Sequence, residues 1–259
     1  ITDQFMRKLE SDDYHVFINP RTNKEVLKCN KCKKNVFPEE DNAELNKCSL
    51  CDGYGQRIKA KEIWNMIVNN AWTCADPGLV FIDKINNSMS NPLREHILIE
   101  STNPCGEVPL LPNESCNLGS INVSKFLNEQ TKEIEWNELK SCIRNSIHFL
   151  DNVVTVNKYP TDEIRELSNN MRRLGLGIMG FADLLTKSKI GYGSEQSFEL
   201  AKKLMKFISD EAWKMSEQLA ETRGTFPSWN KSDFTKNNKK VRNVNCTIIA
   251  PTGSIGTIA

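Results

Sequence analysis

The chain has 259 residues, and its 34 Lys and Arg nearly balance 33 Asp and Glu, for a net charge of +1. This balance argues against a general electrostatic binder of nucleic acid, which normally carries a strong basic excess. No apolar run is long enough to span a bilayer, and no signal peptide opens the chain. Nine cysteines, an odd number, fit a fully paired secreted framework poorly. We therefore expect a cytoplasmic protein whose cysteines serve metal binding or catalysis.

Both ends of the sequence predict a piece of a longer protein. The chain begins at Ile1 rather than at Met, and Ala259 directly follows a Gly-rich loop. The hydrophobic content of 39% is low for a self-contained domain, which indicates an inserted polar module or an incomplete domain.

Four cysteines predict a zinc ribbon near the start of the chain. Cys29 and Cys32 form one Cys-x2-Cys pair, and Cys48 and Cys51 form a second pair after fifteen residues. Two tight knuckles with this spacing can bring four thiolates to one tetrahedral ion. The module spans about Val26 to Gln56 and has the character of an insertion. Redox-active dithiol pairs or free surface thiols are the alternatives.

Periodicity predicts a mixed α and β chain with several long helices. Thr161 and Gly224 are expected to cap an N-terminus and a C-terminus. The expected helices, from the spacing of apolar residues, are 1–10, 59–72, 136–156, 162–170 and 196–223. The expected strands are 16–18, 79–85 and 244–250.

Two features invite a functional interpretation that we do not favour. Gly175-x-Gly177-x-x-Gly180 has the dinucleotide-binding spacing but lacks the strand and the acidic residue that should accompany it. We expect these glycines to permit a close crossing of backbones. His148 has no ligand partner one turn away, so we expect a core or interface histidine.

A loop with two cysteines is the feature around which we interpret the chain. Asn103-Pro104-Cys105-Gly106-Glu107 places a thiol two residues from a carboxylate, and Cys116 follows eleven positions after Cys105. Two further prolines, Pro109 and Pro112, help to exclude most of this stretch from helix interiors and central strands. The first thiol is therefore expected on a constrained loop.

A second loop predicts a phosphate-binding site. Pro251-Thr252-Gly253-Ser254-Ile255-Gly256 follows a β-rich run and offers backbone N–H groups and hydroxyls to an anion. It lacks the Lys of a Walker loop, so an NTPase is not indicated. A plain glycine turn is the alternative for this segment by itself.

These blocks together resemble the catalytic subunit of ribonucleotide reductases. They are Asn103-Pro-Cys-Gly-Glu107 with Glu114-Ser-Cys-Asn-Leu-Gly-Ser120, then Arg173-Leu-Gly-Leu-Gly-Ile-Met-Gly-Phe-Ala-Asp183, then Ala250-Pro-Thr-Gly-Ser254. They occur in the order of that family, and the resemblance covers the chain except the zinc-ribbon-like insertion. The Asn-Pro-Cys-Gly-Glu form is most similar to the adenosylcobalamin-dependent class II enzymes.

The resemblance implies an α/β fold, part of the ten-stranded α/β barrel of these reductases, with the Cys105 loop running through the barrel centre. The implied domains are a barrel segment at 1–25, the zinc-ribbon-like insertion at 26–56, and the central part of the catalytic barrel at 57–259, incomplete at both ends.

The resemblance also implies roles for individual residues. Cys105 is the expected thiyl radical that abstracts the ribose 3′ hydrogen, Glu107 the base for the 3′-hydroxyl, and Asn103 a partner of the ribose hydroxyls. Cys116 is expected in the reducing thiol pair. The implied substrate-binding residues are Asn103, Pro104, Cys105, Gly106, Glu107, Pro251, Thr252, Gly253, Ser254 and Ile255.

The implied cofactor is adenosylcobalamin, beside zinc at the four cysteines. The implied partners are a ribonucleotide, in particular a ribonucleoside diphosphate, a thioredoxin- or glutaredoxin-type reductant, the remaining parts of the same enzyme, and a second copy in a homodimer, with no membrane. No cysteine here matches the family's partner of Cys116, so we expect no turnover from this chain alone.

Three other interpretations stay open at this point. The chain could be a zinc-ribbon module that binds nucleic acid or protein on a non-catalytic scaffold, which only the four-cysteine insertion and its lysines support. It could belong to a class I large subunit or to a related glycyl-radical enzyme. The expected phosphate loop favours a nucleotide substrate.

Overall fold

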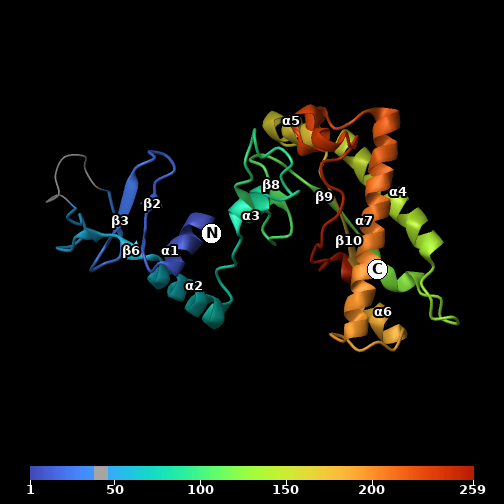
Figure 1. The fold of residues 1–259 in the computed structure, drawn as a ribbon, viewed down its shortest axis with the longest axis horizontal. Helices are drawn as coiled ribbons and strands as arrows, with labels where there is room; N and C mark the ends of the chain where they lie inside the picture. Colours follow the sequence, from blue (N-terminus) through green and yellow to red (C-terminus); the bar gives the residue numbers. More distant parts are fainter. Residues whose placement is uncertain (38–45) are drawn as a thin grey trace. The chain divides into compact units, whose positions relative to one another are not determined.

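A computed structural model describes residues 1–37 and 46–259, so residues 38–45 of the expected insertion lie outside the described residues. The chain divides into two compact units, Ile1–Lys84 and Ile85–Ala259 (Figure 1). Each unit is described by itself.

The first unit combines two helices with small antiparallel sheets. β3 pairs with β2, β4 and β5, and β1 pairs with β6, all antiparallel. The elements are α1 (Asp3–Glu10), β1 (Tyr14–His15), β2 (Phe17–Ile18), β3 (Glu25–Cys29), β4 (Asn35–Val36), β5 (Gly55–Gln56), β6 (Ile58–Lys59) and α2 (Ala60–Cys74), with α3 (Ile82–Asn86) at the unit boundary. The sheet of β2, β3, β4 and β5, which we call the ribbon, therefore includes β2, a strand that precedes the expected insertion at 26–56.

The expected strand at 79–85 is wrong. Residues 82–86 form α3, and Leu79 and Phe81 are exposed. Two backbone bonds connect this stretch to the chain start: the Ile1 amino group donates to the Val80 carbonyl, and Ile82 donates to the Ile1 carbonyl. A short apolar run forms a strand only where a neighbouring strand accepts its ladder, and periodicity does not reveal that neighbour.

The second unit places helices on a short parallel sheet. The first elements are β7 (Ser101–Thr102), β8 (Pro109–Leu110), β9 (Asn117–Asn122), the 3₁₀ helix Val123–Phe126, α4 (Trp136–Val156) and α5 (Asp162–Met171). They are followed by β10 (Leu174–Met179), α6 (Phe181–Lys187), α7 (Glu195–Arg223) and the 3₁₀ helices Pro227–Lys231, Asp233–Asn237 and Ile255–Thr257. Two of these 3₁₀ helices, Pro227–Lys231 and Asp233–Asn237, lie in the polar stretch that follows α7.

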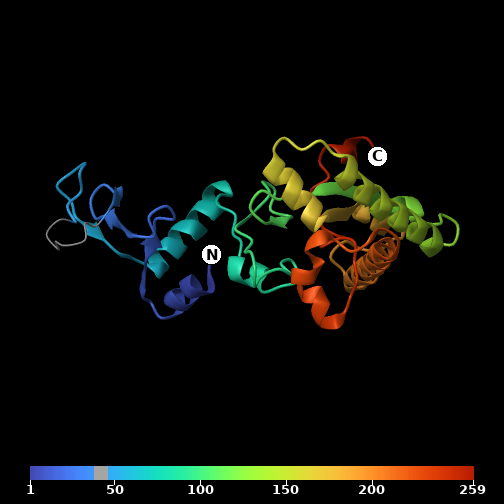
Figure 2. The same cartoon turned by 90° about the horizontal axis from the view of Figure 1, so that it is seen from above.

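The long helices confirm the periodicity prediction. α4 has the predicted bounds, and its apolar positions Leu139, Ile143, Ile147, Leu150 and Val154 are all buried. α4 packs on β9, β10 and α7, as the two views show (Figures 1 and 2). Burial of one apolar stripe per helix supplies the main driving force for this arrangement.

The expected caps are also confirmed. The Thr161 hydroxyl accepts the Ile164 N–H at the start of α5, 3.4 Å away. Gly224 ends α7 at a φ of 80°, a conformation that glycine adopts without steric cost.

β9 and β10 form a parallel pair over six residues, from Asn117 opposite Leu174 to Asn122 opposite Met179. The run expected as a strand at 244–250 lies along the other edge of β10, where Thr247 bridges Leu176. Among the described residues the largest parallel sheet holds two strands. The structure therefore confirms the α/β class, whereas the ten-stranded barrel stays a prediction.

The glycines of the dinucleotide-like spacing serve close packing, as expected. A Cβ at Gly175 would lie 2.7 Å from Ile248 Cδ1, and one at Gly177 would lie 2.8 Å from the Ile248 carbonyl oxygen. Both glycines lie within β10, so side chains there would push away the segment that leads to the predicted phosphate loop.

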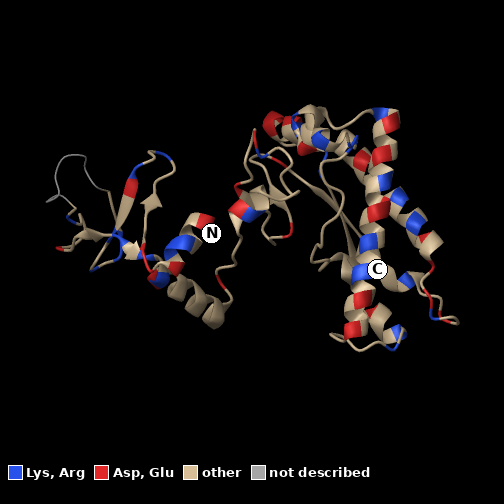
Figure 3. Ribbon diagram, viewed as in Figure 1, with Lys and Arg blue, Asp and Glu red and all other residues tan. Residues whose placement is uncertain are grey.

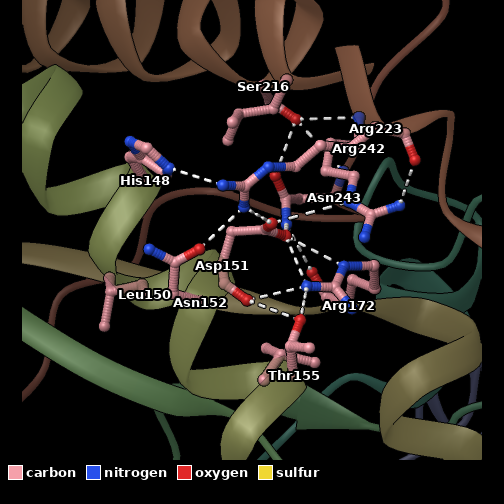
Figure 4. Close-up of polar contacts among 12 residues, drawn as sticks. His148, Leu150, Asp151, Asn152, Thr155, Arg172, Ser216, Arg223, Arg242 and Asn243 are labelled. Atoms are coloured by element: carbon pink, nitrogen blue, oxygen red, sulfur yellow. Dashed lines mark hydrogen bonds and ion pairs between the residues drawn. The ribbon is translucent and has the colours of Figure 1, made fainter.

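A buried carboxylate joins the elements around β10 (Figure 4). Asp151 of α4 accepts from Arg172 Nε and Asn243 Nδ2, each at 2.9 Å. Arg223 and Arg242 lie 3.3 and 3.5 Å from its other oxygen. His148 Nε2 lies 2.8 Å from Arg223 Nη2, and its ring is half-buried rather than part of the core.

Elsewhere, Lys and Arg alternate with Asp and Glu along α7 (Figure 3), in agreement with the balanced composition. Within the described ranges, no helix combines the length and the apolar character needed to cross a membrane.

Candidate active site

The Cys105 loop is the turn of a two-stranded hairpin. β7 and β8 pair so that Thr102 lies opposite Pro109, which brings residues 103–108 into the connecting loop. Gly106 donates to the Asn103 carbonyl at 3.0 Å and adopts a φ of 82°. The Asn103 side-chain oxygen accepts the Val108 N–H at 3.0 Å. Asn103 therefore holds the loop closed and leaves its amide NH₂ as the group it can offer to a ligand.

A pocket of about 340 Å³ brings the two predicted loops together. Its lining includes Cys105 and Glu107 from the hairpin and five residues of the predicted phosphate loop, Pro251 to Ile255. Asn103, Pro104, Gly106 and Cys116 do not line this pocket. The loops are almost 150 residues apart in sequence, so their meeting depends on the tertiary fold.

The second loop offers unused backbone donors. The N–H groups of Gly253 and Ser254 make no hydrogen bond to any described residue. Thr252 has a φ of 59°, and its carbonyl accepts the Gly256 N–H at 2.8 Å, which folds the loop into a compact turn. Free N–H groups on such a turn suit an anion.

Cys116 lies directly before β9, half-buried and surrounded by charged side chains. Burial raises the pKa of its thiol to about 12, the Arg173 guanidinium opposes this shift, and the Glu114 and Glu107 carboxylates add to it. The thiol is therefore protonated at neutral pH, and it lies within electrostatic reach of Glu107, which lines the pocket.

Three buried polar atoms in this region have no hydrogen-bond partner among the described residues. They are Glu107 Oε2, Asn117 Oδ1 and Arg173 Nη2. Buried polar groups are nearly always paired, so each of these three atoms keeps hydrogen-bonding capacity for a water molecule or a ligand.

Some lining residues were not predicted from the sequence. Leu118, Gly119 and Ser120 of β9 and Ala250 line the pocket as well. The first three lie within the block that carried the resemblance, but nothing in their types shows which face of β9 meets the pocket. Glu114 and Arg173 were also quoted, without a role, in two of the blocks that carried the resemblance.

The four predicted metal ligands come together in the first unit. The sulfur atoms of Cys29, Cys32, Cys48 and Cys51 all lie within 4.8 Å of one another. Backbone N–H groups of Leu50 and Gly53 point at the sulfurs of Cys48 and Cys51 at 3.5 and 3.4 Å. A Cβ at Gly53 would lie 2.6 Å from Cys29 Sγ, so the glycine lets the knuckle close around the sulfurs.

Comparisons with known proteins identify relatives that match the whole chain. Vitamin B12-dependent ribonucleoside-diphosphate reductases from Thermoplasma acidophilum and Mycobacterium tuberculosis are 44% and 39% identical to the chain over all 259 residues. The chain spans 30% and 32% of the length of these relatives. The alpha subunit of a class Id ribonucleotide reductase from Actinobacillus ureae shares the fold, with a TM-score of 0.63 at 23% identity over 77% of this chain and 38% of that one.

A family model matches most of the sequence. The matched residues include the Cys105 loop, Cys116 and the strands β9 and β10. The model of the ribonucleotide reductase barrel domain matches residues 1–244, and the chain therefore belongs to the ribonucleotide reductase family.

Proposed function

We propose that the chain supplies the central part of a reductase that converts ribonucleotides to deoxyribonucleotides by a thiyl-radical mechanism. The observation that carries the proposal is the single pocket in which Cys105 and Glu107 meet the loop 251–255. A nucleotide needs a phosphate-binding turn and a reactive thiol near its ribose, and these two loops supply both. A complete ten-stranded barrel around this pocket is part of the proposal.

The predicted residues of the two loops have roles that suit their surroundings. Cys105 is exposed at the loop tip and abstracts the 3′ hydrogen as a thiyl radical. Glu107 Oε2 is buried and unpaired, so it can accept the 3′-hydroxyl proton. Asn103 offers its amide NH₂ to the ribose hydroxyls, and residues 251–255 hold the phosphates.

Cys116 is the proposed member of the reducing pair. The 2′-hydroxyl of the substrate leaves as water, while two thiols lose two electrons and become one disulfide. The second thiol of the pair comes from outside this chain, and a dithiol of the thioredoxin or glutaredoxin type restores both thiols. The substrate proposed from the names of the relatives is a ribonucleoside diphosphate.

The names of the same relatives support adenosylcobalamin as the cofactor of the whole protein. That cofactor supplies the radical that is transferred to a thiol. Cys105 fits such a partner because it lines the pocket and is nevertheless exposed, so a bulky group can approach its sulfur.

Zinc is the proposed metal of the four-cysteine cluster. Four free thiols within 4.8 Å match the sulfur-only set that zinc prefers in structural sites. The ion would join the knuckles around Cys29–Cys32 and Cys48–Cys51 and serve stability rather than catalysis.

The proposed function is tested with Cys105→Ser in the full natural protein, assayed with a ribonucleoside diphosphate, adenosylcobalamin and a dithiol. We expect deoxyribonucleotide formation to fall to background, because a serine hydroxyl cannot carry the radical, while nucleotide binding persists. The matched control is Cys74→Ser, since Cys74 is exposed at the end of α2, and it should keep full turnover. Turnover by Cys105→Ser would reject the proposal.

A further inference from the structure

A buried ion pair lies beside Cys116. Arg173 Nε and Glu114 Oε1 are 2.7 Å apart, and the side chains are 2% and 0% exposed. Glu114 Oε2 accepts the Leu111 N–H at 2.9 Å, and Arg173 Nη1 donates to the Ser90 carbonyl at 3.3 Å. Both charged groups are thus held by further bonds.

The strand register brings Arg173 to Cys116. Leu174 pairs with Asn117 at the start of the parallel ladder, so the preceding residues, Arg173 and Cys116, lie opposite each other one step before it. Glu114 lies two residues before Cys116 on the same loop. Ser115, between them, is fastened by its hydroxyl to the Ser168 hydroxyl at 2.7 Å. The ion pair and the thiol therefore share one small, fixed region.

One nitrogen of this pair is unused. Arg173 Nη2 is buried without a partner among the described residues, whereas Nε and Nη1 each donate one hydrogen bond. A buried guanidinium N–H without an acceptor is costly unless an anion uses it in some state of the protein. The charged groups that act on Cys116 are Arg173 before β10, Glu114 on its own loop and Glu107 on the hairpin loop.

We propose that the Arg173–Glu114 ion pair controls the reactivity of Cys116. Arg173 is a positioning residue whose positive charge and spare N–H group stabilise negative charge on the Cys116 sulfur, and Glu114 holds the guanidinium and limits this effect. Burial, together with the Glu114 and Glu107 carboxylates, holds the pKa of the thiol at about 12 even with Arg173 present, so the thiol would be almost inert without the guanidinium.

The inference rests on the proposed function, in which Cys116 ends each turnover in a disulfide. A reductant thiolate attacks the partner sulfur of that disulfide, the S–S bond breaks, and Cys116 leaves as a thiolate. The second reductant thiol then releases the partner sulfur, and the two protons of the dithiol end on the two cysteines. Stabilising the departing thiolate speeds this step.

The test measures alkylation of Cys116 by iodoacetamide at pH 8–9 in the full natural protein, followed on the peptide that contains Cys116. Below its pKa, a thiol reacts about tenfold more slowly for each unit by which the pKa rises. We expect Arg173→Gln to slow alkylation about tenfold or more. Glu114→Gln should speed it several-fold, and Arg173→Lys should stay near the wild-type rate.

The opposite signs separate this role from a merely structural one. Loss of packing would expose Cys116 and speed alkylation in both variants, so faster alkylation in Arg173→Gln overturns the proposal. The matched control is Arg144→Gln, which breaks the distant Arg144–Glu211 pair and should leave the rate unchanged.

Arg173→Gln leaves a buried carboxylate unpaired and could fail to fold. In that case the double variant Arg173→Gln/Glu114→Gln is compared with Glu114→Gln alone. The proposal expects slower alkylation in the double variant, and an equal or faster rate rejects it. Turnover by Cys116→Ser, assayed in parallel, would reject the proposed function while the alkylation result still stands.

Discussion

At the scale of single residues, the Asn103 side chain, which we expected to contact substrate, forms a hydrogen bond with the backbone of its own loop. Asn103 was predicted as a ribose contact, yet its side-chain oxygen accepts the Val108 N–H and closes the hairpin loop that carries Cys105. Its replacement would disturb the loop as well as any ligand contact. Loss of activity in an Asn103 variant therefore does not by itself identify a substrate contact.

Cys246 gives a prediction for the pH dependence of stability. It is fully buried in the core of the second unit, and burial raises the pKa of its thiol to about 12. Above a pH of about 9 the unfolded chain loses this proton while the folded chain keeps it. The free energy of unfolding therefore falls with rising pH, by up to about 1.4 kcal/mol per unit from this group.

Cys246→Val removes this titration. Between pH 8 and pH 10, urea unfolding should show a loss of stability that is smaller in the variant than in the wild type by about 1–2 kcal/mol. Other groups titrate equally in both proteins, so the difference isolates Cys246. Equal losses would show that the thiol does not stay protonated in the folded state.

At the scale of elements, β10 depends on its glycines. The sequence predicted a glycine-punctuated stretch, and the structure has a strand in which Gly175 and Gly177 pack against neighbouring segments. A Cβ at position 177 would lie too close to the Ile248 carbonyl oxygen, and a backbone atom cannot move away by a change of rotamer as a side chain can. The segment after it leads directly into the pocket residues 250–255.

Gly177→Ala should therefore lower the free energy of unfolding by about 1–3 kcal/mol, the usual cost of overpacking. It should also weaken nucleotide binding, because the segment 248–250 must move. Gly191→Ala is the matched control, since its Cβ would lie 3.9 Å from the nearest atom and should change stability by less than about 0.5 kcal/mol. Urea unfolding measures the stability of each variant, and nucleotide titration measures its binding. Equal effects in Gly177→Ala and Gly191→Ala would contradict the packing argument.

At the scale of the whole molecule, the two units have separate cores. The ribbon core is a small cluster of Leu27, Cys29, Val36 and Cys48, so two of its four buried members are proposed metal ligands. The core of the second unit is built from α4, α7, β9, β10 and their neighbours. Loss of a metal should therefore act on the ribbon alone.

Removal of the proposed zinc ion by a chelator should speed amide hydrogen exchange in β3, β4 and β5 and leave the exchange of α4 unchanged. Without an ion, no metal joins the two cysteine pairs, and the small apolar cluster of this unit buries too little surface to hold them together. Cys32→Ser should reproduce the effect and lower the zinc content, whereas Cys74→Ser, at an exposed position, should not. Unchanged exchange after complete removal of metal would show that the cluster is not structural.

Local patterns in the sequence determined a large part of this protein. The 3.6-residue period marked both bounds of α4, the caps at Thr161 and Gly224 marked helix ends, and the spacing of four cysteines predicted their convergence. The motif blocks led to the family that the comparisons show. Predictions from these features are correct because each pattern involves residues only a few positions apart, and such residues stay close together in the folded protein.

Only the tertiary structure decided which distant segments meet. Among the described residues, the apolar run at 79–85 pairs with no strand and partly forms α3, whereas the glycine-rich run at 174–179 becomes a strand between β9 and residues 245–248. The pocket joins Cys105 to Ser254, and the register of β9 and β10 brings Arg173 to Cys116. Pairing between distant segments depends on which partner offers free backbone groups and space, and no single stretch of sequence contains that information.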